Sequence, residues 1–516
     1  MPKNNRPAVL RWFLRLVALG VVAALGVLGF VAWAWSTARV DTVGEMRFER
    51  PLAIPPLAES RIDDEGRRVF DLTAAEGTSE LLPGEPTTTW GFNGDYLGPT
   101  LRAERGEQVV VNVRNELDET TSVHWHGMHL PAKADGGPHR PVEPGETWSP
   151  TWRIDQPAAS LWYHPHPHGE TEQHVYRGLA GMFILDDPDS EVADRLPHEY
   201  GVDDIPVIVQ DKRFDGDGDL REGNPMFSST GLLGEDLLVN GTYGPYLDVE
   251  TERVRLRLLN ASTARVYDFG FSDGRTFSLI GSDGGLLPRP VRTDHVRLSP
   301  AERAEIVVEM EPGGDVVLMS TPPDIGGDIF GRRFNGGADR FDVLELRAAE
   351  RLRPSPPIPS RLAEAPDVGA RPDAPTDRTF SLSGRSINGE SMDMSRIDET
   401  VELGTTEVWE VENSHGTPHS FHIHDVQFDV LSVDGESPPP ELSGWKDTIF
   451  LPPHATAKVA MRFTDYADPD TPYMYHCHLL KHEDQGMMGQ FVVVEPGDEA
   501  GTPDHTDDGH DHDHDH

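Results

Sequence analysis

The sequence predicts an all-β protein preceded by one transmembrane helix. Short apolar runs of alternating character recur along the chain, for example at residues 109–113, 254–259 and 491–494, and clusters of Gly, Pro, Asn and Asp separate them. This pattern is typical of strands joined by turns. The 50 glycines and 44 prolines leave little room for long helices. The exception is residues 16–35, an uncharged run about as long as a bilayer-spanning helix needs to be.

Residues 1–38 are predicted to form a cytoplasmic stub followed by this membrane anchor. Four basic residues precede the apolar run: Lys3, Arg6, Arg11 and Arg15. A positive flank on this side predicts a cytoplasmic N-terminus and an exported body. The alternative is a signal peptide, with secretion after cleavage near Ala38, but the apolar run is longer than the usual signal core. We therefore expect contact with the membrane through residues 16–35.

The rest of the chain is predicted to form three β-domains. At roughly 150 residues per domain, 516 residues allow about three. We place these domains at residues 39–190, 191–350 and 376–496, with an extended Pro-rich linker at 351–375. Their similar sizes suggest distant copies of one sandwich. Residues 497–516 form a tail that alternates His and Asp, which can bind borderline cations loosely or can simply be a solvated acidic tail.

The charge balance limits the partners that this protein can have. There are 45 Lys and Arg against 88 Asp and Glu, a formal net charge of −43. Nucleic acid binds to basic surfaces, so this balance argues against nucleic acid and favours cations, including metal ions. The single cysteine, Cys477, excludes an intramolecular disulfide.

The histidines carry the chemistry. Ten of the 23 fall into four clusters: His124 and His126; His164 and His166; His419, His422 and His424; His476, His478 and His482. On a strand, residues i and i+2 face the same side, so each His-x-His pair presents two imidazoles about 6.6 Å apart along the backbone. The four such pairs give eight imidazoles, which are too many for one tetrahedral zinc and suit several ions. We expect the isolated histidines to be core or surface residues: His129, His139, His198, His295 and His454. His168 and His174 lie near the second cluster and are expected to support it or to be exposed.

Cys477 predicts a second kind of site. By the same alternation it faces away from its neighbours His476 and His478. The candidates left on its side are His419, His482 and Met487, and two His, one Cys and a weak axial Met form the ligand set of a blue copper site. Two metal sites would then lie back to back, joined by a short covalent route for electrons.

These motifs resemble those of the multicopper oxidases, a family that includes laccases and bacterial cuprous oxidases. The resemblance extends from about Trp90 to Val494, and its most specific part is the run from His476 to Met487. It implies three cupredoxin-like Greek-key β-sandwich domains and four copper ions. The type 1 copper would take His419, Cys477, His482 and Met487. The type 2 copper would take His124 and His422, and the type 3 pair would take His126, His164, His166, His424, His476 and His478. The trinuclear cluster would lie between the first and third domains.

The resemblance also implies a reaction. One-electron oxidation of a reducing substrate, of the phenol type or a metal ion, would be coupled to the four-electron reduction of dioxygen to water. Glu483 and Asp135 match carboxylates that the family uses near the cluster, as proton donors or relays. The alternative is that both carboxylates only orient the ligands.

Three functions stay open on the sequence. The first is a laccase-like oxidase, and the second is a cuprous oxidase for copper tolerance. Cuprous oxidases carry a Met-rich segment near the type 1 site, whereas this chain has only Met392 and Met394 before the third domain's cluster, although the His/Asp tail would suit copper capture. The third is a non-enzymatic exported protein with a structural or division role. Such members have lost copper ligands, and here every ligand is present.

Overall fold

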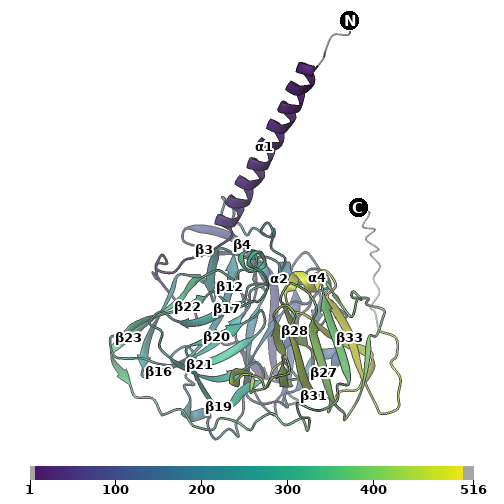
Figure 1. Ribbon diagram of the computed structural model, residues 1–516. Coiled ribbons are helices and arrows are strands. Elements are labelled where there is room, and N and C mark those ends of the chain that lie inside the picture. Colours follow the sequence, from purple (N-terminus) through teal and green to yellow (C-terminus); the bar gives the residue numbers. More distant parts are fainter. Residues whose placement is uncertain (1–5, 504–516) are drawn as a thin grey trace.

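A single long helix projects from a β-rich body in the computed structural model, which describes residues 6–503 (Figure 1). The predicted tail therefore lies mostly outside the described residues. The helix α1 (Arg6–Thr37) is 32 residues long, and its stretch Leu10–Thr37 is long and apolar enough to cross a membrane. At 1.5 Å per residue it measures about 48 Å, more than the roughly 30 Å of a bilayer's hydrocarbon core. The apolar side chains from Leu10 to Val31 are exposed, as lipid contact requires.

Within residues 6–503, the body is built from six sheets in three pairs, and each pair encloses one apolar core. In the first sandwich, β3 (Arg68–Leu82) pairs in parallel with β6 (Gln108–Asn115), and β5 (Leu101–Glu104) pairs in parallel with β11 (Gly181–Asp186). These pairs join strands that are distant in sequence, as Greek-key connections do. One sheet of this sandwich contains β2 (Ser60–Ile62), β3 (Arg68–Leu82), β4 (Glu85–Phe92), β6 (Gln108–Asn115), β8 (Thr147–Trp148) and β9 (Thr151–Arg153). The other contains β5 (Leu101–Glu104), β7 (His124–His126), β10 (Ala159–His164) and β11 (Gly181–Asp186).

The middle sandwich receives the first strand after the helix, because β1 (Arg50–Pro51) pairs in parallel with β15 (Pro245–Thr251). Its remaining strands in the same sheet are β17 (Tyr267–Phe271), β20 (His295–Leu298), β22 (Asp315–Thr321) and β23 (Phe341–Arg353). Its second sheet contains β12 (Asp204–Lys212), β13 (Asp236–Val239), β14 (Thr242–Tyr243), β16 (Arg253–Asn260), β18 (Phe277–Ser282), β19 (Gly285–Thr293) and β21 (Arg303–Glu309).

The third sandwich carries two of the four histidine clusters. One sheet contains β24 (Arg378–Ser383), β25 (Ser386–Ile387), β27 (Thr406–Asn413), β29 (Phe428–Val433) and β31 (Thr456–Arg462). The other contains β26 (Glu399–Glu402), β28 (His419–Ile423), β30 (Thr448–Leu451), β32 (Asp468–Cys477) and β33 (Met488–Val494). The short helices are α2 (Thr171–Arg177), α3 (Ile329–Phe334) and α4 (Leu480–Asp484), with 3-10 turns η1 (Ala132–Ala134), η2 (Ala193–Arg195) and η3 (Pro440–Leu442). The exact domain boundaries stay predictions.

Candidate metal centre

The register of two neighbouring strands separates two kinds of metal-ligating side chain. In the antiparallel pair β28 and β32, Phe421 lies opposite Cys477 and His422 lies opposite His476. Side chains alternate between the two faces of a strand, so each pair points to its own side. Phe421 and Cys477 enter the apolar core of the third sandwich, where Met487 also packs. His422 and His476 point the other way, toward the first sandwich.

Eight buried imidazoles meet between the first and third sandwiches. The first sandwich supplies four of them. Three come from the antiparallel pair β7 and β10, in which His124 lies opposite His164, and His166 comes from the turn after β10. The ligand atoms form overlapping groups whose members lie within 4.8 Å of one another: His124, His126 and His422; His126, His164 and His478; His166, His424 and His476. All eight residues are at most 1% exposed. The Nε2 atom of His476 lies 3.2 Å from that of His424 and 3.3 Å from that of His166. Nitrogens bound at about 2.0 Å to one tetrahedral metal lie roughly 3.3 Å apart.

The free nitrogens of this cluster are those that a metal would use. His124, His164 and His422 each donate Nδ1–H to a backbone carbonyl, at 3.0, 2.8 and 2.8 Å. Their Nε2 atoms are buried and have no hydrogen-bond partner among the described residues, and neither has either ring nitrogen of His478. Buried polar atoms normally have a hydrogen-bond partner, so these unpaired nitrogens indicate a binding site for metal ions. The donor set fits copper ions.

Burial keeps these imidazoles neutral. It lowers the pKa of His126, His164, His422, His424 and His478 well below the usual value, and the neighbouring imidazoles lower it further. Neutral imidazole is the form that binds a metal, because the ligating nitrogen must be free of its proton.

The second group surrounds Cys477. Its Sγ lies 3.4 Å from Nδ1 of His419 and 3.6 Å from Nδ1 of His482, and these two nitrogens are 3.2 Å apart. Two backbone hydrogen bonds hold Met487 beside this group. Its carbonyl accepts from the Cys477 amide, and its amide donates to the His482 carbonyl. Burial raises the pKa of the Cys477 thiol to about 12 and lowers that of His482 to about 4. A soft cation that displaces the thiol proton fits this group.

Two carboxylates each bridge a pair of cluster imidazoles. Asp135 Oδ2 accepts a hydrogen bond from His424 Nδ1 at 2.8 Å, and its Oδ1 lies 3.4 Å from Nδ1 of His124. Glu483 lies 3.0 Å from Nδ1 of His476 and 3.5 Å from Nδ1 of His166. Burial alone would raise the pKa of Glu483, but the surrounding histidines hold it well below its usual value. Both carboxylates can therefore hold Nδ1–H in place and accept or pass on a proton.

Sequence reasoning missed a third carboxylate. Asp447 Oδ1 lies 3.1 Å from Nε2 of His126, and the Asp447 carbonyl accepts from His422. Arg303, from β21 of the middle sandwich, makes two hydrogen bonds to this carboxylate at 2.8 and 2.6 Å, and both side chains are fully buried. The available signal was the charged pair Lys446-Asp447, one residue before the apolar run 449–451, since unpaired charges are rare beside a buried strand.

Several isolated histidines have partners other than cluster imidazoles. His129 lies 2.8 Å from Asp425, His139 lies 2.7 Å from Gln490, and His174 lies 3.0 Å from the hydroxyl of Thr121. His295 is exposed beside Asp294. His129, His139 and His295 are core or surface residues, as expected, whereas His174 is buried rather than exposed and its hydrogen-bond partner is Thr121, not a cluster histidine.

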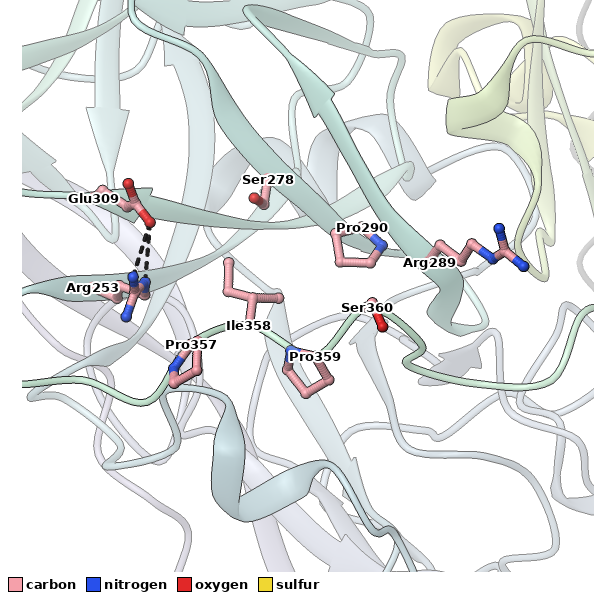
Figure 2. Close-up of a pocket in the computed structure, with 9 residues that line it drawn as sticks. All are labelled: Arg253, Ser278, Arg289, Pro290, Glu309, Pro357, Ile358, Pro359 and Ser360. Atoms are coloured by element: carbon pink, nitrogen blue, oxygen red, sulfur yellow. Dashed lines mark hydrogen bonds and ion pairs between the residues drawn. The ribbon is translucent and has the colours of Figure 1, made fainter.

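An open hollow lies away from the histidines, between the Pro-rich segment and strands of the middle sandwich (Figure 2). Its volume is about 530 Å³, and it is lined by Arg253, Ser278, Arg289, Pro290, Glu309, Pro357, Ile358, Pro359 and Ser360. Arg253 is paired with Glu309 at 3.0 Å, and none of the lining residues is a candidate ligand. The hollow therefore has no contact with the metal-type groups.

Three sandwiches with a blue-copper-type group next to a cluster of eight histidines define a multinuclear copper protein. Comparison with known proteins agrees. Family models described as multicopper oxidase match residues 73–190, 222–321 and 361–497. The chain therefore belongs to the multicopper oxidase family. The predicted family, its cupredoxin-type fold and its association with copper are confirmed.

Relatives within this family have two kinds of name. "Multicopper oxidase mco" of Staphylococcus haemolyticus is 36% identical over 457 residues, which cover 86% of this chain and 92% of that one. "Cell division protein FtsP" of Xenorhabdus nematophila is 39% identical over 453 residues, covering 86% and 93%. Among solved structures, a laccase from Pediococcus acidilactici superimposes with a TM-score of 0.78 at 36% identity, covering 87% of this chain and 94% of that one.

Proposed function

We propose that this protein is an exported, membrane-anchored oxidase that takes single electrons from a reducing substrate and reduces dioxygen to water. The observation that carries this proposal is the convergence of the whole candidate ligand set into two adjacent groups. The eight imidazoles of one group have vacant nitrogens, and the thiol of the other is flanked in sequence by two of those imidazoles, His476 and His478. Such an arrangement suits electron transfer from one group to the other.

Copper ions, one in the Cys477 group and three in the histidine cluster, would supply one-electron redox chemistry. The chain supplies the rest. Cys477 connects the two groups through single peptide units on either side, which makes the electron route covalent. Oxidation of a phenol balances as four ArOH plus O₂ giving four phenoxyl radicals and two H₂O, so four protons move with four electrons. Asp135 and Glu483 are placed at the Nδ1 atoms of cluster imidazoles, where they can pass these protons inward.

Deep burial of the cluster also fits this reaction. Every histidine of the cluster is at most 1% exposed, so large reductants do not reach it. Reducing substrates must deliver electrons at the Cys477 group instead, and the cluster stays reserved for a molecule as small as dioxygen.

Two alternatives each have a supporting observation. A cuprous oxidase is supported by Met392, whose backbone amide donates to Gly486 at 2.9 Å, beside the Met487 turn. A structural role without catalysis is supported by the relative named for cell division. Against the structural role, the chain keeps Cys477, Met487 and all ten clustered histidines.

Oxygen uptake by the copper-loaded full chain tests the proposal. A stabilised Cu(I) complex and a methoxyphenol are compared as electron donors. Turnover of the phenol at a rate comparable to or above that of Cu(I) supports a laccase-like oxidase, whereas a large preference for Cu(I) that is weakened by deleting residues after Pro496 supports copper tolerance. No uptake with either donor, at full copper content, supports the structural role.

The variant Cys477→Ser provides the matching control. It removes the only thiolate ligand while preserving size, so we expect the blue absorption band and oxygen uptake to disappear while circular dichroism stays unchanged. A blue and active variant would overturn the assignment of the whole site.

A further inference from the structure

The body carries an exposed apolar patch at the end of the membrane helix. Met226, Phe227, Ile329 and Phe330 are 58, 55, 73 and 58% exposed, and we call these four residues the anchor-side patch. Phe227 lies 6.3 Å from Phe30 of α1, and Phe330 lies 5.3 Å from Trp35, measured between ring centroids. The patch is therefore continuous with the membrane-spanning helix.

The short helix α3 fixes this patch to the anchor. Arg333 donates two hydrogen bonds to the carbonyl of Trp35, at 2.9 and 2.7 Å, and its guanidinium lies over the Trp35 ring. The ring of Phe334 contacts both Trp35 and Phe227, at 6.2 and 5.3 Å. Tryptophans at a helix end mark the membrane surface. Because α3 is fastened there, its exposed Ile329 and Phe330 lie beside the end of α1 that carries Trp33 and Trp35.

The segment that carries Phe227 also contacts the Cys477 group. The carbonyl of Ser229, two residues after Phe227, accepts a hydrogen bond of 2.8 Å from Nε2 of His482. The amide of Ser229 in turn donates to Asn335, at the end of α3, at 2.8 Å. The other ring nitrogen of His482 faces Cys477. In Figure 1, α4, which carries His482, lies on the side of the body from which α1 leaves. The outer nitrogen of His482 is thus bonded to the segment that also carries Phe227 of the anchor-side patch.

We propose that the anchor-side patch lies in the outer lipid surface and that electrons enter at His482 from a hydroquinone dissolved in the bilayer. This inference rests on the proposed oxidase function. Two hydroquinones and one O₂ give two quinones and two H₂O, so the four electrons and four protons balance. The apolar character of the anchor-side patch favours this class over metal ions, because a cation loses hydration against apolar side chains. The whole chain has a formal net charge of −43, which repels anionic lipids, so apolar contact is the force available for docking.

The position of the patch is tested by labelling the full chain in phospholipid vesicles. The only native thiol, Cys477, is buried, so a nitroxide can be placed on Phe330→Cys and, as control, on Arg289→Cys in β19 at the far end of the body (Figure 1). We expect the label at residue 330 to be protected from a water-soluble nickel chelate and accessible to oxygen, and the control to show the reverse. Equal exposure of both labels to the chelate would overturn the proposal.

The substrate class is tested by oxygen uptake in the same vesicles, with a long-chain hydroquinone and a methoxyphenol as donors. Ile329→Ser should lower the ratio of hydroquinone to methoxyphenol turnover about tenfold, because one exposed isoleucine contributes that much to lipid contact. The matched control Ile62→Ser, which changes an isoleucine in β2 that is 59% exposed against 73% for Ile329, should leave the ratio unchanged. An unaltered ratio in Ile329→Ser overturns this inference, whereas no uptake with either donor in the unmodified chain overturns the oxidase function itself.

Discussion

At the scale of single residues, the proposed proton relay by the two buried carboxylates beside the histidine cluster can be separated experimentally from a role in orienting the ligands. Asp135→Asn and Glu483→Gln preserve shape but remove the charge and the capacity to carry a proton. If the carboxylates relay protons, we expect oxygen uptake to fall by about 10²–10⁴-fold while copper content and the blue band stay normal. Copper analysis and uptake on the same sample make the measurement. Copper loss in parallel with activity would instead show that these groups orient the ligands.

Arg303 stabilises the buried carboxylate of Asp447 by an ion pair. Removing it as Arg303→Met leaves the Asp447 carboxylate buried without its ion-pair partner, which is expected to destabilise the fold by about 3–5 kcal/mol. The exposed pair of Arg61 with Asp71 provides the control, since Arg61→Met should change stability by about 0–1 kcal/mol. Thermal unfolding of both variants tests this, and equal midpoints would contradict the assigned importance of the Arg303 pair.

Residue-scale prediction from the sequence succeeded where local spacing carries the information. The i and i+2 alternation places His476 and His478 on one face and Cys477 on the other, and this follows from backbone geometry alone. The pairing of Arg303 with Asp447 spans 144 residues and two sandwiches. No spacing rule encodes such a contact, so it could be found only from the folded chain.

At the scale of elements, the turn that carries Asp135 depends on a glycine. Gly136 has a φ of +79°, and a Cβ there would lie 1.8 Å from the carbonyl oxygen of Val123. Gly136→Ala must therefore move the turn and displace Asp135 from His124 and His424. We expect a lower thermal midpoint and loss of copper, measured on the purified variant.

Gly145 offers the matched control for that substitution. Its φ of +81° is nearly the same, but a Cβ there meets no atom within 4 Å. Gly145→Ala isolates the conformational penalty of a left-handed residue, about 1–2 kcal/mol, without a clash. If both variants retained copper equally, the close approach at Gly136 would have no bearing on the site.

Elements were predictable to different degrees. The apolar run 16–35 lies within the helix α1, because an uncharged run of this length and composition is typical of a spanning helix. The strand β1, only two residues long, joins the middle sandwich through a parallel pairing with β15. Its sequence, Arg50-Pro51, has no strand pattern, and its conformation is set by the neighbouring strand.

At the scale of the whole molecule, His129 forms a pH-sensitive contact between the first and third sandwiches. Burial alone would lower its pKa, but Asp425 at 2.8 Å outweighs this and raises the pKa to about 9. The unfolded value is about 6.5. Stabilisation is therefore complete below about pH 6.5 and is lost as the pH rises through about 9, up to about 3 kcal/mol.

Thermal midpoints of the unmodified chain and His129→Gln test this dependence. We expect the unmodified chain to be the more stable at pH 6 and to lose that advantage by pH 10. His198→Gln, at an exposed histidine, should follow the unmodified chain throughout. A constant difference between the unmodified chain and His129→Gln across this range would show that the contact does not depend on the imidazole's charge.

The histidine cluster lies at the contact between the first and third sandwiches, which we call the seam. Its ligands come in equal number from the two sides, and in the metal-free chain their vacant nitrogens are buried without compensation. Ions bound there add their binding free energy to the closure of the seam, by linkage between metal occupancy and assembly. We therefore expect bound metal ions to hold the two sandwiches together, and we expect a chain without them to open first at this contact.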